Sequence, residues 1–177
     1  VLHGFIMIHR LCTLASLIRL FALIFLIVTP PATHAAEERT EYRMSLTDVY
    51  GAYQSILARK EACSSAFPQM RGVTDNAYSG WQARHKKLLD ELDQRLNMMI
   101  RSASRDEKDY AKNVGKYEGA ILRQREEVKQ TLLQQPRAEF ELECKALPEF
   151  LKGADSDLEK EFAEQLAVLR KRPLVKK

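Results

Sequence analysis

Apolar residues recur at steps of three and four over most of the chain, which is the spacing of one face of an α-helix. The longest such stretch runs from Asn76 to Gln134. It breaks near residues 102–105, where Ser104-Arg105-Asp106-Glu107 has the order of a capping box. We therefore predict a helical hairpin, with Thr74 or Asp75 as the cap of its first helix. The alternative is one continuous helix about 88 Å long, which a domain of this size would not cover without dimerising.

One helix is expected before the hairpin. Ser45-Leu46-Thr47-Asp48 has the pattern of a capping box, with Ser45 as the N-cap. The polar residues 36–44 are expected to form a flexible lead-in. The apolar stripe behind the cap includes Cys63, so this cysteine is expected to face the core. Phe67-Pro68 ends the helix.

Two further helices are expected after the hairpin. Pro136 suits the first turn of one of them, and Pro148 forces a kink or a restart within it. Gly153 is a suitable C-terminal cap. Ser156-Asp157-Leu158-Glu159 is a third capping-box pattern and starts the last helix.

Composition agrees with a helical domain. The chain has only 7 Gly and 6 Pro among 177 residues, so turn-forming residues are few. Hydrophobic residues make up 45% and charged residues 29%, a balance typical of a folded domain. The predicted fold is all-α, a bundle of four to five helices around the hairpin at 76–134. The helical domain spans residues 45–170, and a basic tail follows at 171–177.

Gly115 and Gly119 form a Gly-x-x-x-Gly step inside the second helix of the hairpin. Charged neighbours such as Lys116 exclude a membrane-spanning dimer of the kind that this spacing often indicates. Each glycine costs about 1 kcal/mol of helix propensity. We expect close approach of a neighbouring helix to compensate for that cost.

The first 35 residues differ from the rest. Arg10 precedes an apolar stretch from Leu11 to Val28, and Thr33-His34-Ala35 then supplies small residues three apart. This order is typical of a secretory signal peptide, so we expect residues 1–35 to be cleaved off by a bacterial Sec-type pathway. The competing interpretation is an uncleaved membrane anchor. The mature protein is expected in the periplasm or outside the cell.

Cleavage would leave two cysteines, Cys63 and Cys144. An even pair in an oxidising compartment predicts one disulfide, whereas the alternative is two buried free thiols. Closing a loop of this length stabilises a chain by about 4 to 5 kcal/mol in the chain-entropy model. No Cys-x-x-Cys motif indicates a redox role.

Candidate chemistry is scarce. The formal net charge of +4 falls to +2 without Arg10 and Arg19 of the leader, so nothing argues for nucleic acid as a partner. His85 is the only histidine after the leader. The sequence has no zinc-ligand spacing, no nucleophile motif and no phosphate-binding glycine loop. We therefore expect no metal, no cofactor and no enzymatic activity.

Two groups of residues are candidate contact surfaces. The first is an aromatic set on the hairpin's apolar stripes, for which the alternative is core packing: Tyr78, Trp81, His85, Tyr110 and Tyr117. The second is basic and is a candidate contact for an anionic surface or an acidic partner, with solvated charge as the alternative. It comprises Arg84, Lys86 and Lys87 on the hairpin and Arg170, Lys171 and Arg172 near the end of the chain.

These observations favour an exported, disulfide-stabilised helical protein that acts by binding another protein in the cell envelope. Inhibitors, immunity proteins, chaperones and adaptors belong to this class, and a homodimer is compatible with it. One alternative is a helical spacer at the envelope surface, attached to the membrane only if the signal is uncleaved. The other alternative is an enzyme with an unrecognised site near His85, for which a pocket with a convergent Ser, Asp or Glu is expected.

Overall fold

A computed structural model of the protein describes residues 31–174, with side chains from residue 36 onward. The predicted signal peptide lies outside the described residues except for 31–35, and so do the last residues of the predicted basic tail, 175–177. The chain divides into two compact units, residues 1–39 and 40–177. The described part of the first unit, 31–39, is helical. The second unit carries the core and the candidate sites.

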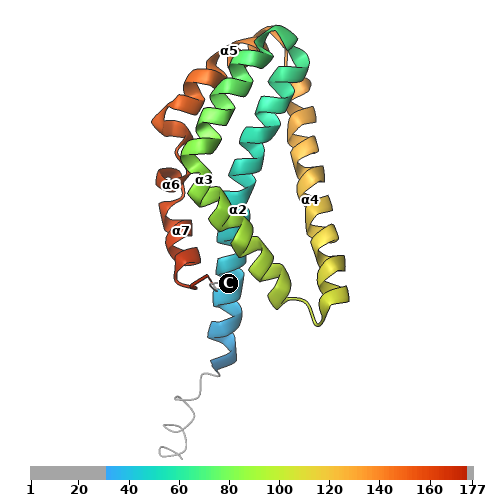
Figure 1. Cartoon of the computed structure of the whole chain (residues 1–177), viewed down its shortest axis with the longest axis vertical. Helices are drawn as coiled ribbons and strands as arrows, with labels where there is room; N and C mark the ends of the chain where they lie inside the picture. The colour runs from blue at the N-terminus through green and yellow to red at the C-terminus, as the bar shows by residue number, and fades with distance from the viewer. Residues whose placement is uncertain (1–30, 175–177) are drawn as a thin grey trace, which may run out of the picture. The chain divides into compact units, whose positions relative to one another are not determined.

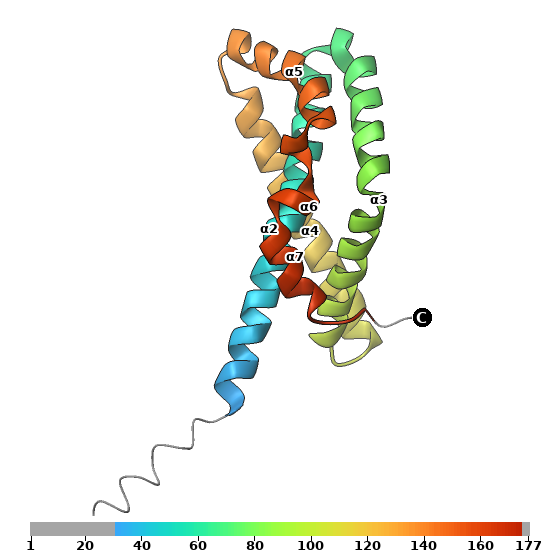
Figure 2. The same ribbon diagram turned by 90° about the vertical axis from the view of Figure 1, so that its left-hand side faces the viewer.

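The described residues form α-helices and short 3-10 turns and contain no strand, which confirms the all-α prediction. In chain order the elements are α2 (Pro31–Ala66), η1 (Pro68–Met70), α3 (Arg71–Ser102), α4 (Glu107–Leu133), α5 (Arg137–Lys152), η2 (Ala154–Ser156), α6 (Leu158–Glu161) and α7 (Ala163–Arg170). Helices α5 to α7 return along α3 (Figures 1 and 2).

Helices α3 and α4 form the predicted hairpin, so the single long helix is excluded (Figure 1). The N-cap of α4 is Asp106 rather than Ser104, because the Asp106 carboxylate accepts the backbone N–H of Asp109 at 2.8 Å. The Ser104 hydroxyl instead donates to the Ile100 carbonyl at the end of α3. Asn113 donates to the same hydroxyl and ties the start of α4 to the turn.

Two helices begin earlier than their capping patterns indicate. Ser45 is not an N-cap but a buried residue inside α2, and residues 36–44 are helical rather than a lead-in. The buried side chain of Tyr42 extends the apolar stripe one turn before Leu46, so tertiary packing outweighs the local cap. Thr74 is likewise fully buried within α3, whose N-cap is Met70.

The C-terminal third also differs in detail. Pro148 lies inside α5 without ending it, and Gly153 caps the helix as predicted. The N-cap of α6 is Asp157, one residue after the predicted Ser156. The last helix is split at Phe162 into α6 and α7.

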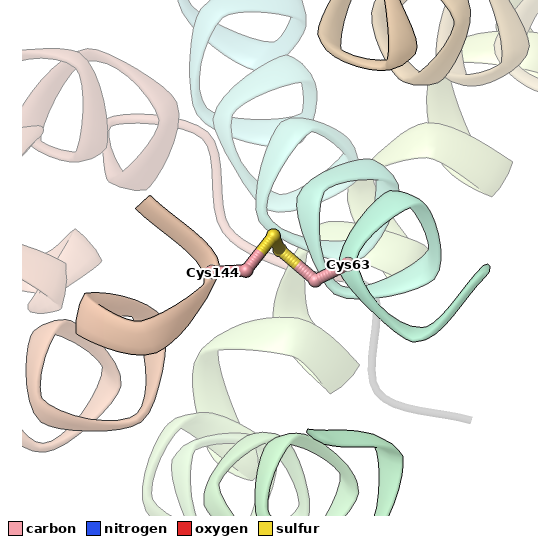
Figure 3. Close-up of a disulfide and its surroundings, with 2 residues drawn as sticks. All are labelled: Cys63 and Cys144. Atoms are coloured by element: carbon pink, nitrogen blue, oxygen red, sulfur yellow. A yellow bond between two sulfur atoms is a disulfide. The ribbon is translucent and has the colours of Figure 1, made fainter. Parts of the chain in front are cut away.

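The core lies between α2, α3, α5 and α7. Its largest fully buried side chains are Trp81, Phe67, Leu46, Leu88, Leu92, Leu147, Leu151, Leu158, Leu166, Leu169 and Val49. A disulfide joins Cys63 of α2 to Cys144 of α5, with the two Cα atoms 5.4 Å apart (Figure 3). This confirms the predicted pairing. Among the described helices, none has an apolar stretch long enough to cross a membrane.

Arg95 of α3 is a charged residue inside the core and is only 3% exposed. Its guanidinium donates to the carbonyls of Leu169 at 2.6 Å and of Arg172 at 3.0 Å, which lie at the C-terminal end of α7. It also pairs with Glu91 one turn earlier on α3. The last carbonyls of a helix lack donors within the helix, so a buried guanidinium can satisfy them.

Candidate functional site

Helix α4 is the least covered helix of the second unit. Its apolar stripe comprises Tyr110, Val114, Tyr117, Ile121, Val128 and Leu132, and only Leu132 is buried. A Cβ atom added at Gly115 would meet nothing within 4 Å, and one at Gly119 would meet only the side chain of Arg123. The expected close approach of another helix at these glycines is therefore wrong for the described residues. The α4 stripe is left half-exposed.

An apolar depression of about 170 Å³ lies where α4 faces α2 and the end of α3. We call it the α4 groove. It is lined by Leu46, Thr47, Tyr50, Gly51 and Gln54 of α2, Leu96 and Met99 of α3, and Tyr117, Ala120, Ile121 and Gln124 of α4. It is smaller than the 300 to 1,000 Å³ typical of pockets that enclose a whole small molecule. Its size suits a single bulky side chain.

Polar side chains also line the groove. Among them is Tyr50, whose hydroxyl donates to the Asp93 carboxylate at 3.3 Å. Burial raises the pKa of Tyr50 to about 12, and the negative charge of Asp93 adds to the effect. The side-chain oxygen Oε1 of Gln54 is buried without a hydrogen-bond partner among the described residues. An unpaired buried acceptor costs about 1 to 3 kcal/mol.

The predicted aromatic set is divided between the core and α4. Trp81 is fully buried and Tyr78 is 8% exposed, and their rings stack with centroids 5.8 Å apart. The Trp81 indole N–H donates to the Ser156 carbonyl at 2.8 Å. These two residues therefore pack the interior, as the alternative interpretation had it. Tyr110 and Tyr117 lie half-buried on α4, and Tyr117 lines the groove.

A second hollow, of about 400 Å³, lies beside His85. We call it the basic pocket. It is lined by Arg84, His85, Lys87 and Leu88 of α3, Lys152, Gly153 and Ala154 around the end of α5, and Asp157, Glu159 and Lys160 at α6. Of these residues only Arg84, His85 and Lys87 were predicted as candidates for a site. The residues of α5 and α6 lie far later in the sequence and come close to them only through the fold.

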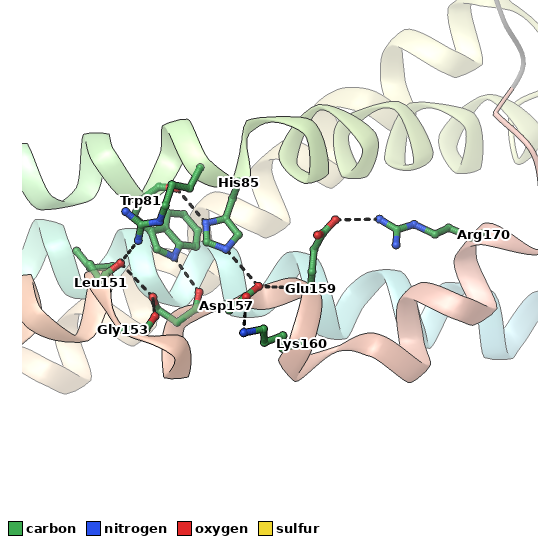
Figure 4. A network of polar contacts seen from close by, with 10 residues as sticks. Trp81, His85, Leu151, Gly153, Asp157, Glu159, Lys160 and Arg170 are labelled. Atoms are coloured by element: carbon green, nitrogen blue, oxygen red, sulfur yellow. Dashed lines mark hydrogen bonds and ion pairs between the residues drawn. The ribbon is translucent and has the colours of Figure 1, made fainter.

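His85 is fixed between α3 and α6 (Figure 4). Its Nδ1 lies 2.9 Å from the Trp81 carbonyl. A carbonyl can only accept, so Nδ1 carries the hydrogen. Nε2 lies 3.7 Å from a carboxylate oxygen of Asp157. The ring also stacks on Trp81 with centroids 4.6 Å apart.

The carboxylates of the basic pocket are already engaged. For Asp157, burial raises the pKa, but hydrogen bonds from the backbone amides of Glu159 and Lys160 outweigh it and lower the pKa overall. Glu159 pairs with Arg170 at 3.3 Å. The pocket thus has the convergent acids expected beside a catalytic His85, but its lining residues include no hydroxyl or thiol nucleophile.

Two of the three basic residues selected near the end of the chain are used within the fold. Arg170 pairs with Glu91 at 2.9 Å and with Glu159. The Arg172 guanidinium lies over the ring of Tyr42. Lys171 is exposed. Among residues 31–174, no cluster of His, Cys, Asp and Glu has the composition of a metal site.

No family model, no curated protein and no solved structure matches the chain.

Proposed function

We propose that the protein acts in an oxidising compartment of the cell envelope by binding a protein partner, and that the α4 groove receives a bulky apolar side chain of that partner. The observation that carries the proposal is the partly exposed apolar stripe of α4 beside the groove. The disulfide between Cys63 and Cys144 supports the compartment, because such bonds persist in oxidising environments.

The contrast between helices supports a contact at α4. Along α3 the residues Trp81, Leu88 and Leu92 are at most 1% exposed, whereas Tyr117 and Ile121 of α4 keep part of their surface in contact with water. Covering apolar surface contributes about 25 cal/mol per Å². A partner side chain placed between Tyr117 and Ile121 would complete the burial that the chain itself leaves unfinished. Anchor side chains of this kind supply most of the binding energy in many interfaces.

The apolar and aromatic lining of the groove indicates the chemistry of the occupant. An aromatic side chain would bury against Ile121 and the rings of Tyr50 and Tyr117, which line the same groove as Gln54. Tryptophan and tyrosine are enriched at binding hot spots. We therefore expect an aromatic anchor.

The test is site-specific photo-crosslinking in the cells that make the protein. A photoreactive phenylalanine analogue would replace Tyr117 in the groove, and in a matched control it would replace Leu142, which is 67% exposed on α5. A discrete adduct is expected from position 117 and not from position 142. The change Ile121→Asp, which places a charge in the groove, should abolish the adduct while leaving the helical circular dichroism spectrum unchanged.

Equal crosslinking from both positions, or none from position 117, would overturn the proposal. An adduct of twice the mass of the chain would identify the partner as a second copy.

A further inference from the structure

We propose that the basic pocket binds a phosphoryl group carrying two negative charges, such as a phosphate monoester. This inference is independent of the α4 groove, which is built from other residues. Four cationic side chains from three helices line the pocket: Arg84 and Lys87 of α3, Lys152 of α5 and Lys160 of α6.

The charge of the lining is unbalanced. Four cations face two carboxylates, Asp157 and Glu159, which leaves a formal charge of +2 with His85 neutral. Both carboxylates also have cationic or backbone partners, since Asp157 caps α6 and Glu159 pairs with Arg170. A dianion would neutralise the remaining charge.

Arg84 is the positioned donor. Its guanidinium donates to the Leu151 carbonyl near the end of α5, so it is held across the boundary between α3 and α5 rather than paired with a carboxylate. A guanidinium has five N–H donors in a planar fork, and this geometry matches two oxygens of a phosphoryl group. Lys87 lies one turn further along α3, on the same side of the helix.

The two lysines of the opposite wall are held only loosely. Lys152 pairs with Glu149 through side chains that are 61% and 78% exposed, and Lys160 is 74% exposed and 3.7 Å from Asp157. Exposed pairs of this kind contribute little, so either ammonium group can turn toward a bound anion. The pocket volume of about 400 Å³ leaves room for a substituent attached to the phosphoryl group.

The experiment titrates the full chain with inorganic phosphate and with phenyl phosphate at low ionic strength, followed by isothermal calorimetry and by amide NMR shifts. Saturable binding is expected, with shifts gathered at α3 near Arg84 and at residues 152–160. The double variant Lys87→Glu Lys160→Glu should weaken binding by at least about tenfold, as the loss of two charge-assisted contacts implies.

The matched control is Lys86→Glu Lys171→Glu, which makes the same change in charge at exposed lysines outside the pocket lining. It should change the affinity by less than about twofold. No saturable binding of either anion, or equal weakening in both double variants, would overturn the proposal, because the second result indicates attraction to the overall charge only.

A flotation assay separates the two sources of a phosphate monoester. Vesicles containing phosphatidic acid in phosphatidylcholine are compared with pure phosphatidylcholine vesicles. Binding to the former that is lost in Lys87→Glu Lys160→Glu, but kept in the control, assigns the pocket to a lipid headgroup. Saturable binding of phenyl phosphate without flotation assigns it to a soluble molecule.

Discussion

Arg95 should be the most important charged residue for the stability of the fold. The change Arg95→Met keeps a long unbranched side chain in the core and removes the guanidinium. It takes donors from the carbonyls of Leu169 and Arg172 and takes one of two cationic partners from Glu91. The end of α7 would lose both side-chain hydrogen bonds from Arg95 but keep the ion pair between Arg170 and Glu91.

The expected cost is about 3 kcal/mol in the free energy of unfolding. Breaking a buried ion pair by removing one partner costs about 3 to 5 kcal/mol. The lower end of this range is expected because the Glu91 side chain is 17% exposed and keeps its ion pair with Arg170. A carbonyl left without a donor in a buried position adds about 1 to 3 kcal/mol. The Leu169 carbonyl keeps the Arg172 backbone N–H at 3.3 Å, and fraying of the end of α7 can hydrate the Arg172 carbonyl, which limits their share.

Urea denaturation followed by circular dichroism, with the disulfide intact, measures this cost. The matched control is Arg105→Met, because Arg105 makes a similar i,i+4 pair with Asp109 on a side chain that is 88% exposed. The control should cost less than about 0.5 kcal/mol. A loss below about 1 kcal/mol for Arg95→Met would refute the reasoning, because it would mean that water replaces the guanidinium at little cost.

Three further outcomes are expected. Cys63→Ser should lower the free energy of unfolding by about 4 to 5 kcal/mol under oxidising conditions, and no change there would contradict a structural role for the bond. Gly115→Ala should raise it by about 0.5 to 1 kcal/mol, because the new methyl group meets no neighbour; a loss of stability would mean that the site is covered. In an ultraviolet titration one tyrosine should ionise near pH 12, and this titration step should be absent in Tyr50→Phe. Because the folded pKa of Tyr50 is raised above an unfolded value of about 10, its contribution to stability should be lost as the pH rises from about 10 through 12. An ordinary tyrosine titration that Tyr50→Phe leaves unchanged would contradict this.

The sequence predicts well what depends on local spacing. The hairpin follows from apolar periodicity and from the polar stretch around Asp106, which both act within a few residues. The pairing of Cys63 with Cys144 follows from their number and from the proposed export. Helix starts are predicted less well, because Ser45 satisfies the capping pattern while Tyr42, one turn earlier, finds a buried position that keeps the helix going.

Arg95 shows why residue type misleads in this fold. An arginine among Asp90, Asp93 and Lys87 has the surroundings of a solvated face. Arg95 is held in the interior because its guanidinium donates to two carbonyls at the end of α7, 74 and 77 residues later in the sequence. No pattern within α3 encodes these acceptors, so the interior position of Arg95 depends on how α7 docks.

The same long-range dependence explains the two hollows. Trp81 was predicted as a candidate interface residue, yet its indole N–H holds the Ser156 carbonyl and so fixes the turn between α5 and α6 against α3. That turn lies between Lys152 and Lys160, so its position places these two lysines in the same pocket as Arg84. The α4 groove instead results from incomplete packing. After the turn at Asp106, α4 buries only one residue of its apolar stripe. In the two proposals, Trp81 acts on the basic pocket by positioning its charged residues, whereas the direct apolar contact with a partner is assigned to α4.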